Sequence, residues 1–227
     1  MPDTRNGFNR RNYWKKLRIG SYYRWKMLST VDEVFATKRV LDVGSHDGFL
    51  LSLFPDTFRI AVDITIPDQL TSHPFVVADA KALPFTSQSF NLVLFMDVIE
   101  HIADEDGLAE SLARILDQDG KLILSTPSAG IKLFPIFLTN FISKQWGHIY
   151  RLGYSSELLN SVFRGKFSVQ IEEWNAPLFR LFYLPMKFVS LISKRFAFFL
   201  LDRIATYDSN HKNGLEGYLL LTGKVIK

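Results

Sequence analysis

The stretch VLDVGSHDG at residues 40–48 decides the fold. Its first four residues are typical of a buried strand, and Gly44 and Gly48 indicate a tight turn after it. A glycine at a strand-to-helix turn can adopt a positive φ and lets a ligand approach the backbone closely. We predict a short helix over residues 49–54, stopped by Pro55, whose first N–H groups can face an anionic group.

Outward from this stretch, strands and helices alternate along the chain. Predicted helices cover residues 104–116, ending near Gly120, and 154–163, with Ser155 or Ser156 as its cap. Predicted strands lie at residues 39–43, 59–63, 75–78, 92–96, 121–124, 167–174 and 217–226. The alternation predicts an α/β fold: a Rossmann-like, seven-stranded, mostly parallel sheet with helices on both faces.

The length of 227 residues fits one large domain with additions. Residues 1–36 are predicted to form a basic and aromatic helical arm, and residues 37–227 the α/β domain. After Pro127 the alternation breaks down, so we expect an apolar helical cap built from insertions at about 128–165 and 175–210.

Composition excludes several kinds of site. The chain has no cysteine, which removes disulfides, thiolate zinc sites, iron–sulfur clusters and cysteine nucleophiles. The net charge of +4 is unevenly distributed: residues 27–127 carry six basic groups and sixteen acids, whereas residues 128–203 carry ten and four. This second region also holds 11 of the 20 phenylalanines, a combination that points toward nucleic acid or membrane contact.

No targeting or membrane-spanning segment is predicted. The basic N-terminus lacks an apolar signal region, and no run of 18 uncharged apolar residues occurs. We therefore expect a cytoplasmic protein.

Asp63, nineteen residues beyond Gly44, ends the second predicted strand, where its carboxylate can accept hydrogen bonds from ribose hydroxyls. The turn reads G-x-x-x-G and lacks the G-x-G-x-x-G spacing that fits a pyrophosphate. The pattern therefore favours a nucleoside ligand over a dinucleotide.

Five segments in order resemble the class I S-adenosylmethionine-dependent methyltransferases, especially the small ones related to quinone-biosynthesis and other small-molecule enzymes. They are VLDVGSHDGFL at 40–50, AVDIT at 61–65, VVADAKALPF at 76–85, SFNLVLFMDVIEHIAD at 89–104 and LARILDQDGKLILSTP at 112–127. The last predicted strand, at 217–226, fits the reversed final strand of that family.

The resemblance implies S-adenosyl-L-methionine as cofactor and assigns its contacts to one set of residues. These are Asp42, Gly44, His46, Gly48, Asp63, Ile64, Asp79, Ala80, Asp97 and Val98. By position, Asp42 and Gly44 lie near the amino-acid end, Asp63 holds the ribose, Asp79 reaches the adenine edge and Asp97 lies near the methyl-bearing end. His46 replaces the second glycine of the family and either faces the cofactor carboxylate or points to solvent.

The same resemblance places Glu100 and His101 at the mouth of the site as catalytic candidates. His101 suits a general base, because imidazole titrates near neutral pH, and His148 is the second candidate. The D-x-x-E-H pattern is also similar to the metal-ligand set of some related enzymes, although we expect no metal here. In the alternative reading, Glu100 and His101 cap the following helix and shape the pocket.

In the cap, residues 175–201 hold four basic residues and no acid. Arg180, Lys187 and Lys194 are seven residues apart and predict a basic stripe on an apolar helical surface, with Pro185 splitting the stretch in two. Such a surface suits a membrane interface, and the alternative is that these helices form the core of the cap. In similar methyltransferases an N-terminal helix folds over the cofactor, so the resemblance makes Tyr22, Tyr23 or Arg24 of the arm a candidate to close the site.

We therefore expect an S-adenosylmethionine-dependent methyltransferase. The apolar cap favours a hydrophobic or lipid-linked small-molecule acceptor, with oxygen favoured over carbon. The basic flanks favour an anionic membrane surface, met peripherally on the inner face, over nucleic acid. Two alternatives stay open: an RNA methyltransferase, favoured by the basic arm, and a non-catalytic cofactor-binding subunit or lipid-binding partner.

Overall fold

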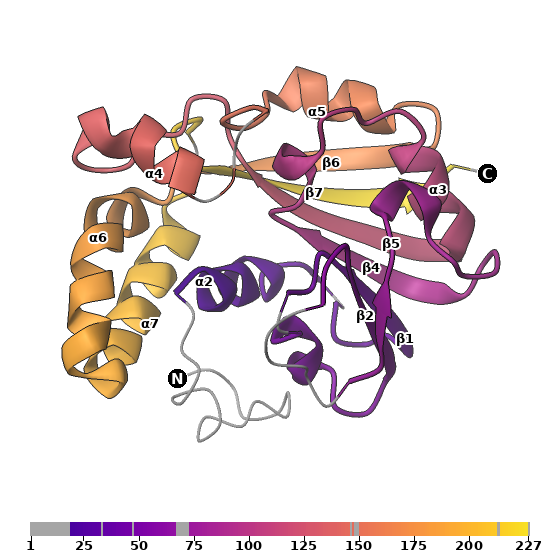
Figure 1. Ribbon diagram of the computed structural model, residues 1–227, viewed down its shortest axis with the longest axis horizontal. Coiled ribbons are helices and arrows are strands. Elements are labelled where there is room, and N and C mark those ends of the chain that lie inside the picture. Colours follow the sequence, from indigo (N-terminus) through magenta and orange to yellow (C-terminus); the bar gives the residue numbers. More distant parts are fainter. Residues whose placement is uncertain are drawn as a thin grey trace.

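The computed structural model describes residues 19–226, except residues 33, 47, 67–72, 146, 148, 149 and 213. Its centre is one seven-stranded sheet in the order β3-β2-β1-β4-β5-β7-β6 (Figure 1). The strands are β1 Arg39–Val43, β2 Phe58–Asp63, β3 Phe75–Val77, β4 Phe90–Met96, β5 Leu116–Pro127, β6 Phe167–Trp174 and β7 Tyr218–Val225. Each of the seven predicted strands is present.

Strand directions follow the prediction as well. β1 pairs in parallel with β2 and β4, β2 with β3, and β4 with β5. β7 runs antiparallel to both β5 and β6, so it alone is reversed. The chain order reverses between β1 and β4, and in open α/β sheets ligands bind at the carboxyl ends of the strands beside such a point.

Helices cover both faces of the sheet, as predicted. The α-helices are α2 Ile19–Leu28, α3 Leu108–Ile115, α4 Thr139–Gln145, α5 Ser156–Phe163, α6 Pro177–Ile192 and α7 Lys194–Asn210. Short 3-10 turns are η3 Leu50–Leu53, η4 Ala80–Ala82, η5 Ile99–His101 and η6 Ile136–Leu138. One apolar core joins the sheet to α2, α6 and α7, and a second joins its other face to α3 and α5.

Local sequence explains several boundaries. Ser155 is the cap of α5, its hydroxyl accepting a hydrogen bond from the Leu158 N–H at 3.2 Å. The helix predicted over 104–116 starts only at Leu108, because the Asp104 carboxylate accepts the Asp106 N–H at 3.0 Å and holds a turn instead. It also ends before Gly120: Leu116 already pairs with Phe90, so β5 begins five residues earlier than predicted.

The prediction that Pro185 divides the cap helix is wrong. α6 continues through Pro185, and the break comes at Ser193. Pro185 has no N–H to donate to the Leu181 carbonyl, four residues before it in the helix. Because Pro185 and Leu181 are both exposed, water can bind that carbonyl instead. At Ser193 the hydroxyl accepts the Phe196 N–H at 3.3 Å and starts α7.

The basic stripe is also not formed as predicted. Arg180 is buried, pairs with Glu216 at 2.9 Å and lies over the Phe134 ring, whereas Lys187 and Lys194 are exposed. The seven-residue spacing predicts that the three side chains share one side of a single helix. At Arg180, however, that side of the helix packs against Glu216 and the apolar core that joins the sheet to α6.

The described part of the arm is packed into the domain. Tyr22 and Tyr23 of α2 are fully buried. The Tyr23 hydroxyl donates to Asp208 of α7 at 2.9 Å and accepts from the Trp174 indole at 2.8 Å. These long-range contacts fix α2 across the end of the sheet beside α7 (Figure 1).

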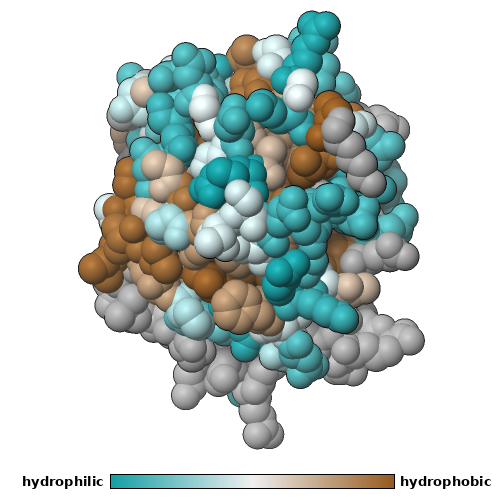
Figure 2. All heavy atoms as spheres, turned by 90° about the vertical axis from the view of Figure 1, so that its right-hand side faces the viewer, coloured by the Kyte–Doolittle hydropathy of each residue, from teal (hydrophilic) through white to brown (hydrophobic). Residues whose placement is uncertain are grey.

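Within the described residues no helix is long and apolar enough to cross a membrane. The end of the molecule away from α6 and α7 faces the viewer in Figure 2. There hydrophilic side chains spread over much of the surface, with apolar areas between them.

Candidate functional site

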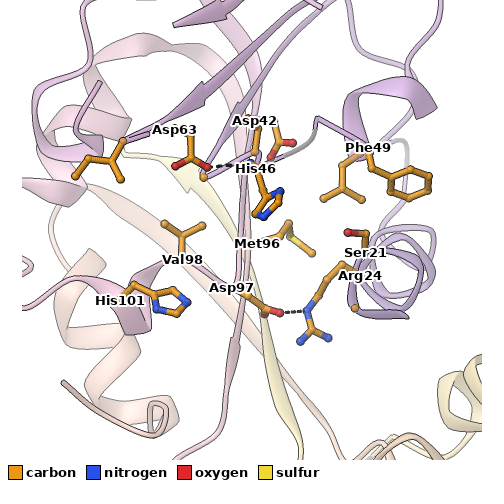
Figure 3. Close-up of a pocket in the computed structure, with 15 residues that line it drawn as sticks. Ser21, Arg24, Asp42, His46, Phe49, Asp63, Met96, Asp97, Val98 and His101 are labelled. Carbon is orange, nitrogen blue, oxygen red and sulfur yellow. Dashed lines mark hydrogen bonds and ion pairs between the residues drawn. The ribbon is translucent and has the colours of Figure 1, made fainter. Parts of the chain in front are cut away.

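A pocket of about 420 Å³ opens at the carboxyl ends of β1, β2 and β4, beside α2 (Figure 3). Its volume falls in the range of small-molecule sites. Eight residues singled out from the sequence as site candidates line it: Asp42, Gly44, His46, Asp63, Ile64, Asp97, Val98 and His101. The other lining residues include Gly20, Ser21 and Arg24 of α2 and the apolar side chains of Phe49, Leu50 and Met96.

Gly44 begins the turn that forms the floor of the pocket. Its φ is +74°, and its N–H donates to the Val62 carbonyl at 2.8 Å, which ties the turn to β2. A Cβ on Gly44 would lie 2.2 Å from Cγ2 of Val98 on the opposite wall. Only glycine fits there without displacing that wall, which matches the backbone approach that the sequence predicts.

His46 and Asp63 are held together above this turn. His46 has a positive φ of 47°, which is uncommon outside glycine, and its N–H donates to Asp63 Oδ2 at 2.9 Å. The Asp63 carboxylate is thereby fixed at the end of β2 and faces the pocket (Figure 3). Strained backbone of this kind persists where the surrounding structure enforces it, often at binding sites.

Asp97 follows β4 and is held from two sides. It too has a positive φ, 56°. Its Oδ1 accepts the Ser125 hydroxyl at 2.7 Å, and its Oδ2 pairs with Arg24 Nε of α2. The Arg24 guanidinium lies 4.0 Å from the Tyr218 ring centre. Burial lowers the pKa of Arg24, but Asp97 and Tyr218 outweigh it and hold that pKa above its ordinary value.

Glu100 lies behind the pocket wall. Its side chain is fully buried, does not line the pocket, and its Oε2 accepts the Thr126 hydroxyl at 3.0 Å. Burial, and then the charge of Asp97, raise the pKa of Glu100 to about 8. Its placement suits a group that shapes the end of β4, the alternative reading left open by the sequence.

His101 lies on the rim of the pocket, on the side away from Arg24 (Figure 3). Its Nδ1 is 3.1 Å from the Gly147 carbonyl oxygen. Because a carbonyl oxygen only accepts, Nδ1 carries the proton there, and the neutral ring has its lone pair on Nε2. This tautomer leaves His101 able to take a proton from a ligand in the pocket.

Three of the predicted contacts lie outside the lining. Asp79 accepts the Lys81 N–H at 2.8 Å and begins η4, Ala80 is buried beside it, and Gly48 closes the turn by donating to the Ser45 carbonyl at 2.8 Å. The catalytic candidate His148 lies outside the described residues. Over the described ranges, no three carboxylates and imidazoles gather as a metal site would require.

Sequence reasoning did not identify the apolar wall or Ser21. Phe49 and Leu50 follow the glycine turn directly and Met96 ends β4, so their position beside the motif was the available signal. Ser21 lies one turn before Arg24 on α2. Tyr22, Tyr23 and Arg24 of this helix are candidates to close the site, but nothing local in the sequence singles out Ser21.

Comparison with known proteins finds related methyltransferases. Residues 41–124 match the family model described as a methyltransferase domain. An uncharacterized methyltransferase of Mycolicibacterium gilvum (strain PYR-GCK) is 33% identical over 97 residues, which cover 38% of this chain and 38% of that protein. The match therefore spans little more than a third of that relative's length.

Solved structures share the fold. Phosphoethanolamine N-methyltransferase 2 of Haemonchus contortus, in complex with S-adenosyl-L-methionine, has a TM-score of 0.61 at 15% identity, covering 100% of this chain and 60% of that one. The YcgJ protein of Bacillus subtilis has a TM-score of 0.55 at 16% identity, covering 91% and 99%. The matched domain, the homologous methyltransferase and the shared sheet agree with the resemblance in the sequence: residues 41–124 form a methyltransferase domain, within a sheet that has the fold of these solved structures.

Proposed function

We propose that the protein transfers a methyl group from S-adenosylmethionine to an oxygen atom of a hydrophobic or lipid-linked small molecule at a membrane surface. The observation that carries the proposal is the convergence of Asp42, Asp63 and Asp97, from three neighbouring strands, on one pocket around the Gly44 turn. A site that presents carboxylates at several strand ends suits a ligand with hydroxyl and cationic groups.

The residues of the pocket fit the cofactor group by group. Asp63, already oriented by the His46 N–H, would accept hydrogen bonds from the ribose hydroxyls. Asp42 and the Gly44 turn would meet the amino-acid end, where the absence of a side chain on Gly44 allows a close approach. Asp97 would lie near the positively charged sulfur, where a carboxylate is favourable.

The bound cofactor supplies an electrophilic methyl group. In the proposed reaction the acceptor oxygen forms a bond to the methyl carbon, the carbon–sulfur bond breaks with its electrons going to sulfur, and the hydroxyl proton passes to His101 Nε2. The Gly147 carbonyl holds the ring in the tautomer that this role needs. Most of the remaining effect comes from holding the reacting atoms in line.

Support for an apolar acceptor comes from the walls of the pocket. Phe49, Leu50 and Met96 bring apolar side chains to it, and the neighbouring α2 packs on the apolar α6–α7 hairpin. Oxygen is favoured over carbon because a positioned base such as His101 suffices to deprotonate a phenol, sugar or acid hydroxyl.

Calorimetry with S-adenosylhomocysteine tests cofactor binding. We expect the wild type to release binding heat and Asp63→Ala to bind at least about tenfold more weakly, since charge-assisted hydrogen bonds are lost. Asp56→Ala removes an exposed carboxylate that does not line the pocket and serves as the matched control. Absence of binding heat for the folded wild type would refute the proposal.

Turnover is tested with radiolabelled cofactor on separated lipid, RNA and soluble small-molecule fractions. Label entering the lipid fraction supports the proposal, label in RNA would support an RNA methyltransferase instead, and cofactor binding without transfer would support a non-catalytic subunit. On the labelled acceptor, His101→Ala should reduce turnover by about a hundredfold while leaving S-adenosylhomocysteine affinity nearly unchanged. Full turnover by that variant would remove His101 from the mechanism.

A further inference from the structure

The turn of the α6–α7 hairpin carries five exposed apolar side chains between residues 188 and 199, which we call the hairpin tip. Its members are Phe188 at 69% exposure, Leu191 at 83%, Ile192 at 89%, Phe196 at 54% and Phe199 at 53%. Single exposed apolar residues are ordinary, but several large ones gathered in one short segment are typical of an interaction site. In Figure 1 this end of the hairpin projects away from the sheet at the lower left.

The hairpin has another face that already supplies its core. Tyr183 and Met186 of α6 and Phe198 and Leu201 of α7 are buried. Phe198 packs edge-on against Tyr22 of α2, with ring centres 4.7 Å apart. The exposed residues of the hairpin tip are therefore not needed to pack the domain. The alternative that these helices form the core of the cap explains only their buried face.

The charged side chains that the hairpin itself carries at its tip are all basic. Lys187, Lys194 and Arg195 are exposed beside it, and no acid occurs between residues 175 and 201. The first acid of α7, Asp202, accepts a hydrogen bond from the Tyr22 hydroxyl on the inner side. Apolar side chains flanked by lysine and arginine suit a lipid interface, where the rings and aliphatic groups enter the bilayer and the cations meet phosphates.

From this we infer that the hairpin tip is a membrane-docking surface that inserts Phe188, Leu191, Ile192, Phe196 and Phe199 into a bilayer rich in anionic lipid. A second copy of the chain is the less favourable occupant, because a two-fold contact would bring the same cations together. Charge complementarity selects the negatively charged leaflet. The inference extends the proposed function by naming the partner surface.

The hairpin tip and the pocket are separate sites. None of the five tip residues lines the pocket, whereas α2 contacts α7 on one side and lines the pocket with Ser21 and Arg24 on the other. Docking through the tip would therefore hold the pocket near the bilayer without occupying it. Membrane binding is measurable without cofactor, so its failure is distinguishable from failure of methyl transfer.

Vesicle flotation of the full chain tests the inference, with phosphatidylcholine vesicles compared with vesicles of phosphatidylcholine and phosphatidylglycerol. We expect the wild type to float with the anionic vesicles and Leu191→Ser/Ile192→Ser to bind at least about tenfold more weakly. Lys187→Gln/Lys194→Gln/Arg195→Gln should bind anionic vesicles about a hundredfold more weakly. The matched control Phe58→Ser/Leu158→Ser, two exposed apolar residues of β2 and α5, should float like the wild type.

Circular dichroism and S-adenosylhomocysteine binding, both unchanged in each variant, would show that the domain is intact. If the double serine variant proves misfolded, Phe188→Ser replaces it. Equal binding of wild type and tip variant would overturn the inference. The inference would also be overturned if sedimentation showed the wild type to be a dimer and the tip variant a monomer while neither protein bound vesicles.

Discussion

Substitution of Gly44 by alanine has two separable consequences that the structure makes explicit. The residue has a φ of +74°, a conformation that side-chain-bearing residues rarely adopt, and its added Cβ would lie 2.2 Å from Val98 Cγ2. The first consequence is local to the backbone and does not depend on any neighbour. The second depends on Val98, so it can be removed by truncating that side chain.

The two contributions have different sizes. Forcing an L-residue into the left-handed region costs about 1–2 kcal/mol. Overpacking against Val98 adds about 1–3 kcal/mol, since the wall must shift to open more than 1 Å of space. We therefore expect Gly44→Ala to lower the free energy of unfolding by about 2–5 kcal/mol, and to weaken S-adenosylhomocysteine binding because the floor of the pocket moves.

Urea unfolding of four proteins and one control measures these contributions. Gly165→Ala is the control, because Gly165 has a φ of +81° but no atom within 4 Å of its added Cβ, so it carries only the backbone cost. Gly44→Ala/Val98→Ala should be more stable than the sum of its single variants by about 1–3 kcal/mol. If Gly44→Ala is no worse than Gly165→Ala, or if the double variant is additive, the steric argument is wrong.

Two further predictions concern the charges around the pocket. Arg24→Met leaves the Asp97 carboxylate, among the described residues, with the Ser125 hydroxyl as its partner and should lower the free energy of unfolding by about 2–4 kcal/mol. Arg203→Met, on the exposed face of α7, should lower it by under about 1 kcal/mol, and similar losses in urea unfolding would contradict a structural ion pair. Glu100 has its folded-state pKa raised to about 8, so the folded protein binds the extra proton, and stability should fall as pH rises from about 4.5 to 8, by at most about 1.4 kcal/mol per pH unit. Glu100→Gln should remove that slope from the unfolding free energy, and an unchanged slope would place the titration elsewhere.

The parts of the site that sequence predicted are those that depend on neighbours along the chain. The glycine turn follows β1 directly, and Asp63 and Asp97 come at or after the ends of buried strands. Parallel strands bring their carboxyl ends to one edge of the sheet, so these positions were fixed as soon as the strands were identified. Glu100 shows the limit of this reasoning, because the one-turn η5 directs it behind the wall while His101, the next residue, reaches the rim.

The parts that sequence did not predict depend on residues far apart in the chain. Arg24 meets Asp97 across 73 residues, and Tyr23 meets Asp208 across 185. The prediction of a basic stripe was wrong for the same reason, because the periodicity of one helix does not show that Glu216, 36 residues further along the chain, lies beside Arg180. Periodicity does separate the buried from the exposed residues of α7, but it does not say which apolar face meets the rest of the protein.

Helix α2 is where these long-range contacts come together. Ser21 and Arg24 line the pocket, and Tyr22 and Tyr23, between them in sequence, reach α7 through Asp202 and Asp208. Two faces of one ten-residue helix therefore contact the site and the inner side of the hairpin. A change at the inner side, such as loss of the Asp208 carboxylate, can reach Arg24 through α2. A change at the exposed hairpin tip touches neither face of α2, and this is why tip variants can test membrane docking while leaving the pocket intact.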